Sequence, residues 1–250
     1  MISVVIPSYK DPLLHKTIDS LLDNSVGEIE IIPVLDGYKT EVKDDPRVKP
    51  IFLEKNVGMR DAINIGVSKA KGKYIMRTDE HCMFGKCFDM ILTDNIEDNW
   101  IVTPRRYLLN PDKWERFGDP IDHEKMVIRR SVIGKRKGGM KFHSAQCGGP
   151  DDIVSEKTAM QGSCWIMTIG WWHNVIGKLQ TEGYGTHYQD SVEMIFKTWQ
   201  AGGKLMLNKG TWYAHKAKEF PRTHSYPTKL AEKSWAYALS QWEDYFKGRK

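Results

Sequence analysis

An acidic residue and an imidazole follow a short hydrophobic run in the first third of the chain. Residues 74–76 have strand composition, and Asp79 and His81 come two positions apart just after them. Residues i and i+2 of an extended chain point to the same side, so both side chains can reach one divalent cation. A carboxylate with an imidazole suits Mn²⁺ or another first-row metal better than the all-oxygen cage of Ca²⁺. The alternative is that Asp79 caps a following helix, with Glu80 and His81 solvated.

The segments around Asp79 alternate between strand and helix patterns. Short apolar, β-branched runs predict buried strands over residues 2–6, 29–35, 48–53 and 74–76. Apolar residues at helical spacing follow the first and third runs, so we expect an α/β fold with a mostly parallel central sheet flanked by helices. Ligands bind beyond the carboxyl ends of the strands in such sheets. Pro7, Asp36 and Asp79 all lie at those ends, which favours the metal site over the helix cap.

The second half is less regular. Residues 107–157 are basic, rich in glycine and without a clear period, so we expect an irregular insert. The pattern after it predicts a helix that contains Asp190 and Glu193. Short strands are expected over residues 100–104, 204–207 and 212–215. A C-terminal helix over residues 230–246 carries an aromatic and aliphatic face, which we expect to pack on the body rather than on a partner or a membrane.

Composition narrows the class of protein. The 250 residues are 40% hydrophobic and carry a formal net charge of +5, which allows a substantial core. No apolar run reaches the roughly 20 residues of a membrane span, and no signal peptide is expected at the first residues. Four scattered cysteines without a CxxC pair favour reduced thiols and a cytoplasmic location. Basic residues within 129–137 and at the C-terminus suit the phosphates of a donor, a nucleic acid or an anionic membrane, or else form a solvated loop.

A series of short motifs runs through the first half in a fixed order. They are Val4-Val5-Ile6-Pro7-Ser8-Tyr9, Asp36-Gly37, Asn56-Val57-Gly58, Ala62-x-Asn64-x-Gly66 and Ala70-x-Gly72-x-Tyr74-Ile75. Together they resemble the family 2 glycosyltransferases of GT-A (Rossmann-like) fold. Asp79-Glu80-His81-Cys82 departs from the Asp-x-Asp of that family and is similar to the Asp-x-His-Cys of polypeptide N-acetylgalactosaminyltransferases.

Motifs in the second half resemble the same transferases. They are Met160-Gln161-Gly162-Ser163-Cys164-Trp165, Asp190-Ser191-Val192-Glu193, Trp199-Gln200-x-Gly202-Gly203-Lys204-Leu205 and Ala214-His215. The resemblance covers most of residues 2–106 and 159–216. It implies one compact GT-A domain, with a nucleotide-sugar-binding half over 1–106 and an acceptor-binding half over 107–250.

The resemblance also implies a cofactor and a donor site. The donor would be a nucleotide-sugar, most simply a UDP-sugar, and Mn²⁺ or Mg²⁺ would be held by Asp79, His81 and His215. The residues expected to contact the donor are Pro7, Tyr9, Asp36, Asn56, Arg60, Asp79 and Trp212. Other roles stay open for several of them: a turn residue for Asp36, an exposed helix arginine for Arg60 and a wall residue for His215. Trp165 and Trp212 are either platforms for a sugar or base, or core aromatics.

Asp190 is the expected catalytic residue, as a general base or as a group that positions the acceptor. Glu193 lies one helical turn further and is expected to face the same cleft. The alternative for Asp190 is a helix N-cap. Family 2 enzymes that invert and the N-acetylgalactosaminyltransferases imply opposite stereochemistry, so that outcome stays open.

The acceptor is open as well. A glycan or lipid-linked sugar, a hydroxymethylated pyrimidine in DNA and a protein are all candidates, although a Golgi mucin-type enzyme is not expected without an anchor or lectin segment. Basic and histidine side chains after His215 either close over the diphosphate or form a solvated loop: Lys216, Lys218, Arg222 and His224. Two other classes remain, a binding protein without catalysis and a nucleotidyltransferase. Against the second, this sequence does not open with the glycine-rich phosphate loop that is usual in nucleotidyltransferases.

Overall fold

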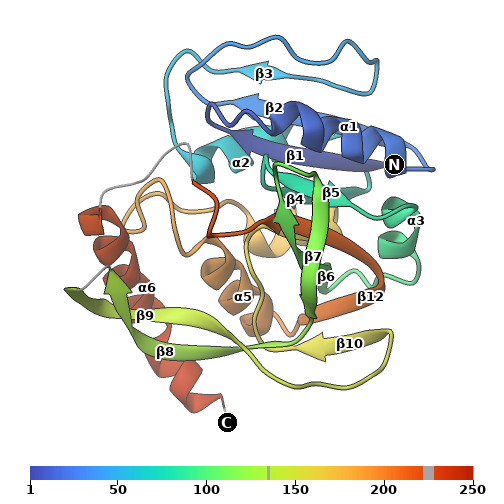
Figure 1. Ribbon diagram of the computed structural model, residues 1–250. Coiled ribbons are helices and arrows are strands. Elements are labelled where there is room, and N and C mark those ends of the chain that lie inside the picture. Colours follow the sequence, from blue (N-terminus) through green and yellow to red (C-terminus); the bar gives the residue numbers. More distant parts are fainter. Residues whose placement is uncertain (134–135, 222–227, 250) are drawn as a thin grey trace.

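The computed structural model describes residues 1–133, 136–221 and 228–249 (Figure 1). Its strands are β1 (Ile2–Ser8), β2 (Ile29–Leu35), β3 (Ile51–Phe52), β4 (Tyr74–Thr78), β5 (Cys82–Phe84), β6 (Trp100–Asn110), β7 (Glu115–Ile121), β8 (Glu124–Ile133), β9 (Arg136–Gln146), β10 (Val154–Lys157), β11 (Cys164–Thr168) and β12 (Lys204–Lys216). Its helices are α1 (Leu14–Asn24), α2 (Met59–Lys69), α3 (Phe88–Thr93), α4 (Ile169–Trp171), the π-helix η1 (Trp172–Ile176), α5 (Asp190–Gln200) and α6 (Thr228–Gly248). Within these residues a ten-stranded mixed sheet runs in the order β10-β12-β6-β11-β4-β1-β2-β3, with β5 beside β12 and β7 beside β6.

The first half supplies the parallel centre of this sheet. β1 lies between β2 and β4, all three run parallel, and β3 extends the edge beside β2. Every residue of β1 and β2 is buried, as expected for strands covered on both faces. Alternate side chains feed two cores: Val5 and Ile32 pack with α2 and α5, whereas Val4 and Ile31 pack with α1 and α3. The predicted parallel central sheet with flanking helices is confirmed.

Antiparallel pairing joins the second half to this centre. β11 pairs with β4 on one side and with β6 on the other, and β6 then pairs parallel with β12. β12 is one strand of 13 residues, and its register against β6 shifts between Asn208 and Trp212. The expectation of two strands over 204–207 and 212–215 is therefore corrected, because a bulge bends the strand without ending it.

Residues 107–157 are mostly strand rather than irregular. β7 folds back on β6, β8 and β9 pair as a separate two-stranded sheet, and β10 adds to the edge of β12. Many side chains of β7, β8 and β9 are exposed, so their charged and glycine-rich sequence lacks the apolar alternation of a half-buried strand. The boundary expected at 106/107 falls inside β6, and both halves share one sheet.

The C-terminal helix α6 packs on the body of the molecule through the expected aromatic face. The Trp242 ring stacks on Phe196 with 5.3 Å between centroids, and its Nε1 donates to the hydroxyl of Tyr184 at 2.6 Å. Phe246 meets Phe142 of β9 at 5.6 Å. Across residues 1–133, 136–221 and 228–249, neither α6 nor any other helix is long and apolar enough to cross a bilayer.

Gly66 of α2 lies against the central strands with no room for a side chain. A Cβ there would lie 2.4 Å from Cγ1 of Val5 and 3.1 Å from Cγ2 of Val34. We expect Gly66→Ala to lower the free energy of unfolding by about 1–3 kcal/mol, because buried strand side chains cannot move aside. Urea unfolding followed by circular dichroism measures this, with Ser68→Ala on the exposed face of the same helix as control. Unchanged or increased stability of Gly66→Ala would contradict the close packing.

Candidate active site

The carboxyl ends of β1, β2 and β4 open onto one cavity of about 420 Å³. Both halves of the chain contribute to its lining, which supports the expectation that ligands bind at this edge. Four of the residues predicted to contact the donor border it: Pro7, Tyr9, Asp36 and Asp79. His187 and Tyr188 from the loop before α5 also border it, and nothing in their sequence pattern indicated this.

Asp79, His81 and His215 meet in the lining of this cavity. The strand β5 starts directly after His81 and pairs antiparallel with β12, in a register that sets His215 opposite Cys82. Nε2 of His215 lies 3.0 Å from Oδ2 of Asp79, and the two imidazole centroids are 4.9 Å apart. A strand and not a helix follows Asp79, so the helix-cap alternative is wrong.

The three side chains fit a first-row metal ion. One ligand atom from each of Asp79, His81 and His215 lies within 4.8 Å of the other two, so a single ion can contact all three. One oxygen and two imidazole nitrogens suit Mn²⁺, whereas Mg²⁺ and Ca²⁺ favour oxygen alone.

Arg77 of β4 is a site residue that the sequence reasoning missed. Its side chain is 2% exposed, and its Nη2 donates to Oδ1 of Asp79 at 2.6 Å. Burial alone would raise the pKa of Asp79, but Arg77, His215 and His81 outweigh that effect and hold this pKa well below its usual range. Asp79 is therefore ionised at neutral pH, the state that a cation requires. The i, i+2 rule that linked Asp79 with His81 also links Arg77 with Asp79, so the signal was present.

Asp11 and Glu80 brace the same site. Oδ2 of Asp11 lies 3.1 Å from Nδ1 of His81, a contact that can fix the orientation and tautomer of the imidazole. The Glu80 carboxylate accepts from the backbone N–H of Tyr9 at 3.0 Å and from the hydroxyl of Ser8. Burial, together with the nearby charge of Asp11, raises the pKa of Glu80 to about 8. Glu80 thus ties the end of β4 to the end of β1, and it is only partly exposed.

Asp36 uses its carboxylate within the protein. It accepts from the backbone N–H of Val57 at 2.6 Å and of Gly58 at 2.8 Å, and from Nδ2 of Asn56 at 2.9 Å. Burial raises the pKa of Asp36 in spite of these bonds. Asp36 and Asn56 therefore hold the loop that begins α2, and their contact with a nucleoside stays a prediction.

Asp190 borders a second cavity of about 490 Å³. This cavity shares four residues with the first: Met59, Arg77, Asp79 and His215. Asp190 is 7% exposed, and its Oδ2 has no hydrogen-bond partner in the part of the chain that the structure describes. Its side chain lies so close to Gly162 that a Cβ there would be 2.7 Å from Oδ2. The N-cap of α5 is Gln189, without a side-chain cap, so the capping alternative for Asp190 does not hold.

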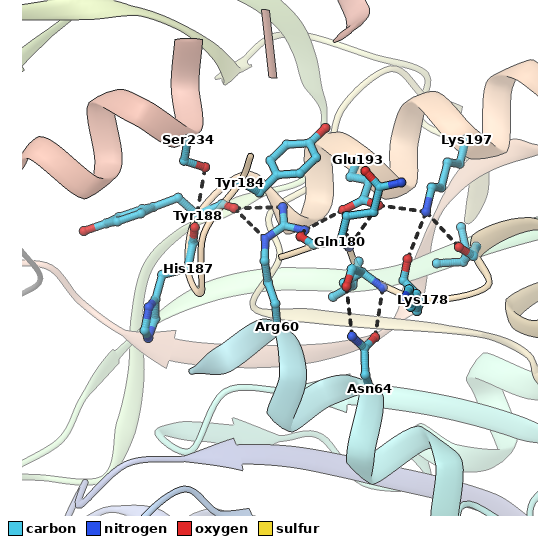
Figure 2. Close-up of polar contacts among 12 residues, drawn as sticks. Arg60, Asn64, Lys178, Gln180, Tyr184, His187, Tyr188, Glu193, Lys197 and Ser234 are labelled. Carbon is cyan, nitrogen blue, oxygen red and sulfur yellow. Dashed lines mark hydrogen bonds and ion pairs between the residues drawn. The ribbon is translucent and has the colours of Figure 1, made fainter. Parts of the chain in front are cut away.

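Arg60 and Glu193 form a buried ion pair (Figure 2). Nη1 of Arg60 lies 2.5 Å from Oε2 of Glu193, and the two side chains are 0% and 1% exposed. Other N–H groups of Arg60 donate to the carbonyl oxygens of Gln180 and Tyr188, and the guanidinium lies 4.1 Å from the centroid of the Tyr184 ring. The predictions that Arg60 contacts a pyrophosphate and that Glu193 faces the cleft are corrected. The two buried charges pair with each other, and neither residue borders the two cavities described above.

The two predicted aromatic platforms lie elsewhere. Trp165 is fully buried and stacks on Trp172 with 5.8 Å between centroids. Trp212 packs against Tyr107 and under the guanidinium of Arg116, and it borders neither cavity described above. Its expected donor contact is corrected, because Trp212 lies three positions before His215 on the same strand, a separation of about 10 Å.

The basic residues after His215 lie only partly within the described chain. Lys216 and Lys218 border the second cavity. Arg222 and His224 lie outside the described residues. Closure of this segment over a diphosphate therefore stays a prediction.

With this geometry established, comparison with known families identifies the chain. Residues 3–149, more than half of its length, match the family described as glycosyl transferase family 2. The chain belongs to glycosyl transferase family 2. The cavity at the carboxyl ends of β1, β2 and β4 thus lies in a family 2 fold.

Two relatives of this family 2 chain cover different shares of it. An uncharacterized glycosyltransferase, EpsJ of Bacillus subtilis (strain 168), is 32% identical over 40% of this chain and 31% of its own length. Polypeptide N-acetylgalactosaminyltransferase 12 of Mus musculus is 23% identical over 98% of this chain and 44% of its own length. This chain therefore spans less than half of the curated relatives that it matches here.

A solved structure shows the fold. The crystal structure of GalNAc-T7 with UDP, GalNAc and Mn²⁺ matches 99% of this chain and 50% of that chain, with a TM-score of 0.78 and 19% sequence identity. The expected GT-A architecture is confirmed.

The buried ion pair makes a testable prediction. Glu193→Gln leaves the Arg60 guanidinium buried without a counter-charge, so we expect the free energy of unfolding to fall by about 3–5 kcal/mol. Urea unfolding gives the difference. Glu243→Gln breaks the exposed pair with Lys247 and should leave the unfolding midpoint almost unchanged. A stable Glu193→Gln variant that has lost only activity would contradict the structural role.

Proposed function

We propose that this family 2 chain is a metal-dependent glycosyltransferase that moves a sugar from a UDP-sugar to an acceptor hydroxyl. The observation that carries the proposal is the meeting of Asp79, His81 and His215 beside the cavity at the carboxyl ends of the parallel strands. Three protein ligands leave coordination positions for a substrate, and a diphosphate leaving group needs positive charge at that place. The presence of UDP and Mn²⁺ in the GalNAc-T7 structure supports this choice of donor and metal.

In this proposal the chain holds and orients the reacting groups. Asp79, His81 and His215 would hold Mn²⁺, or Mg²⁺ in its place, which when bound supplies Lewis-acid charge to the departing diphosphate. The hydrogen bond from Arg77 keeps the Asp79 carboxylate ionised and fixes its orientation, and the contact with Asp11 orients the His81 imidazole. Pro7, Tyr9 and Asp36 border the side where the nucleoside would lie, and Asn56 supports Asp36 from behind it.

Asp190 stands on the acceptor side. Asp190 borders a cavity that also contains Asp79 and His215, and its Oδ2 has no hydrogen-bond partner among the described residues, which suits a group that accepts the proton of an acceptor hydroxyl. In an inverting reaction the hydroxyl oxygen attacks the anomeric carbon, the bond to the diphosphate breaks and Asp190 takes the proton. In a retaining reaction the departing phosphate takes the proton, and Asp190 orients the hydroxyl.

The proposed acceptor is a hydroxyl of a glycan or a lipid-linked sugar, and the proposed location is the cytoplasm. A hydroxymethylated pyrimidine in DNA is the second candidate, favoured by the basic side chains of β8 and β9. Binding without catalysis and nucleotidyl transfer are the remaining alternatives. The Asp190 oxygen, which has no hydrogen-bond partner among the described residues, argues for catalysis against the first of them.

Metal-dependent release of UDP tests the donor side. We expect wild type to release UDP from at least one UDP-sugar with Mn²⁺ but not with EDTA, and Asp79→Asn to lower this rate about 10²–10³-fold because the metal loses its carboxylate. Asp98→Asn, an exposed position that borders neither site cavity, is the matched control. A folded wild type that releases UDP from no donor would overturn the proposal.

Transfer to an acceptor tests Asp190. We expect Asp190→Asn to lower the transfer rate about 10²–10⁴-fold if the residue is a general base, because the amide cannot take the proton. NMR of the product gives the anomeric configuration. Inversion with a large loss supports the base role, retention with a modest loss supports the orienting role, and an unchanged rate in either case excludes Asp190 from the reaction.

A further inference from the structure

The cavity that Asp190 borders, called the acceptor-side cavity below, also has an arginine in its wall. Within the described residues, no carboxylate lies close enough to this arginine to balance its positive charge well. Arg105 and Arg106 are neighbours on β6, but only Arg105 has a close partner: its Nε and Nη2 donate to the carboxylate of Asp122 at 2.9 and 2.8 Å. Arg106 borders the cavity of about 490 Å³ and is 17% exposed. Its side chain makes no hydrogen bond within the described residues, and its buried Nε has no acceptor there. The carboxylate that faces it, Glu124, is 3.6 Å away.

Glu124 cannot fully neutralise Arg106, because it also faces a second cation. Nζ of Lys157 lies 3.7 Å from Oε2 of Glu124, and this lysine is almost completely buried. Oε1 of Glu124, the atom nearer to Arg106, accepts a hydrogen bond from Nε2 of Gln161 at 2.6 Å. The Glu124 carboxylate thus faces two basic side chains, each at a distance beyond a good hydrogen bond, so its charge is divided between them.

Further positive charge lies along the rim. Lys216 and Lys218 border the cavity, and Lys218 is also near Lys141 and His143 of β9. Burial, and after it the positive charges of Arg129, Lys141 and Lys218, lower the pKa of His143 to about 4.

Among the described residues, three carboxylates also border the cavity, and two of them have roles already described. Asp79 is paired with Arg77 and with His215. Glu219 borders the cavity beside Lys218. Asp190 is the group proposed above to receive the acceptor hydroxyl, so its oxygen needs a hydroxyl donor and not an anion.

We propose that Arg106 forms an anion-binding subsite in this cavity, with Lys218 at its rim, and that the acceptor is a glycan with a carboxylate or phosphate group near the reacting hydroxyl. The inference rests on the proposed function and narrows its acceptor. A guanidinium presents parallel N–H donors that match a carboxylate or a phosphate. A neutral sugar would leave the N–H groups of Arg106 with no closer ionic partner than Glu124 at 3.6 Å, whereas an anionic sugar would satisfy them and leave Asp190 to its hydroxyl.

Matched sugars test this subsite. The probes are the methyl glycosides of glucose, galactose and mannose, their C6 uronates and their 6-phosphates, and a hydroxymethylated and a plain DNA duplex. Affinities are measured by isothermal titration calorimetry on the full chain, with and without UDP and Mn²⁺. For at least one sugar we expect the anionic form to bind about tenfold tighter than the neutral form, as for a hydrogen bond to a charged group. The uronate and phosphate arms show which anion the subsite takes.

Variants test whether Arg106 causes the tighter binding of the anionic sugar. Arg106→Gln should abolish the difference between the anionic and the neutral sugar, and Arg105→Gln, which removes the same group one residue earlier, should retain it. Lys218→Gln at the exposed rim should reduce the difference, and it keeps the test decisive if Arg106→Gln fails to fold. Thermal unfolding of each variant checks its fold.

The outcomes separate this inference from the proposed function. Equal affinities for neutral and anionic sugars, or a preference that survives Arg106→Gln, would overturn the inference whether or not UDP binds. Failure to bind UDP and Mn²⁺ would overturn only the proposed function. Tighter binding of modified DNA than of every sugar, lost in Arg106→Gln, would overturn the glycan acceptor in favour of nucleic acid.

Discussion

The buried pair of Arg60 and Glu193 holds the two sides of the site in a fixed relation. Arg60 lies in the first turn of α2, just after the loop that Asp36 holds, and Glu193 lies one turn after Asp190 in α5. A buried charge is tolerated only when it is paired and its hydrogen bonds are complete. Here the guanidinium also bonds the carbonyl oxygens of residues 180 and 188, while Lys197 lies 2.7 Å from Glu193. The network fixes how α2, α5 and the loop between η1 and α5 meet, and so where Asp190 stands relative to Asp79.

A second constraint works at the strand ends, where acidic side chains alternate with a guanidinium and imidazoles. Arg77 faces Asp79, Asp79 faces His215, and Asp11 faces His81. Each prospective ligand therefore has a partner that holds its position before any cation arrives. Such support from neighbouring groups is what gives a ligand set its geometry and affinity.

The sequence carried the parts of the site that depend on local periodicity. The spacing of two residues just after β4 indicated that Asp79 and His81 act together. The pattern of parallel strands placed Asp36 at the same edge of the sheet. The place of His215 came from motif resemblance, because only the pairing of β5 with β12 brings it near, and no local rule predicts a pairing of strands so far apart. The contacts that these residues make with a donor remain predictions.

Burial of charge and aromatic rings is where the sequence reasoning failed. An arginine on an amphipathic helix usually lies in solvent, and nothing near Arg60 shows that its partner is Glu193. Trp212 has the large aromatic ring that a sugar platform needs, but Arg116 and Tyr107 already pack against that ring. The strands within residues 107–157 were not predicted, because their exposed faces carry charged residues and glycine instead of alternating apolar residues.

The distance along the chain between Asp79 and His215 has a consequence for synthesis. Their contact joins positions 136 residues apart. At usual translation rates the ribosome needs on the order of ten seconds to make that stretch. During this time β1, β2 and β4 can already pair, but the outer edge of β4 stays open until β11 has been made, since β11 is its other neighbour. An open parallel edge invites pairing with other chains. The nascent protein thus passes through a stage in which β1, β2 and β4 have paired but His215 is missing from the metal site and one sheet edge is unprotected. A chaperone would matter most at this stage.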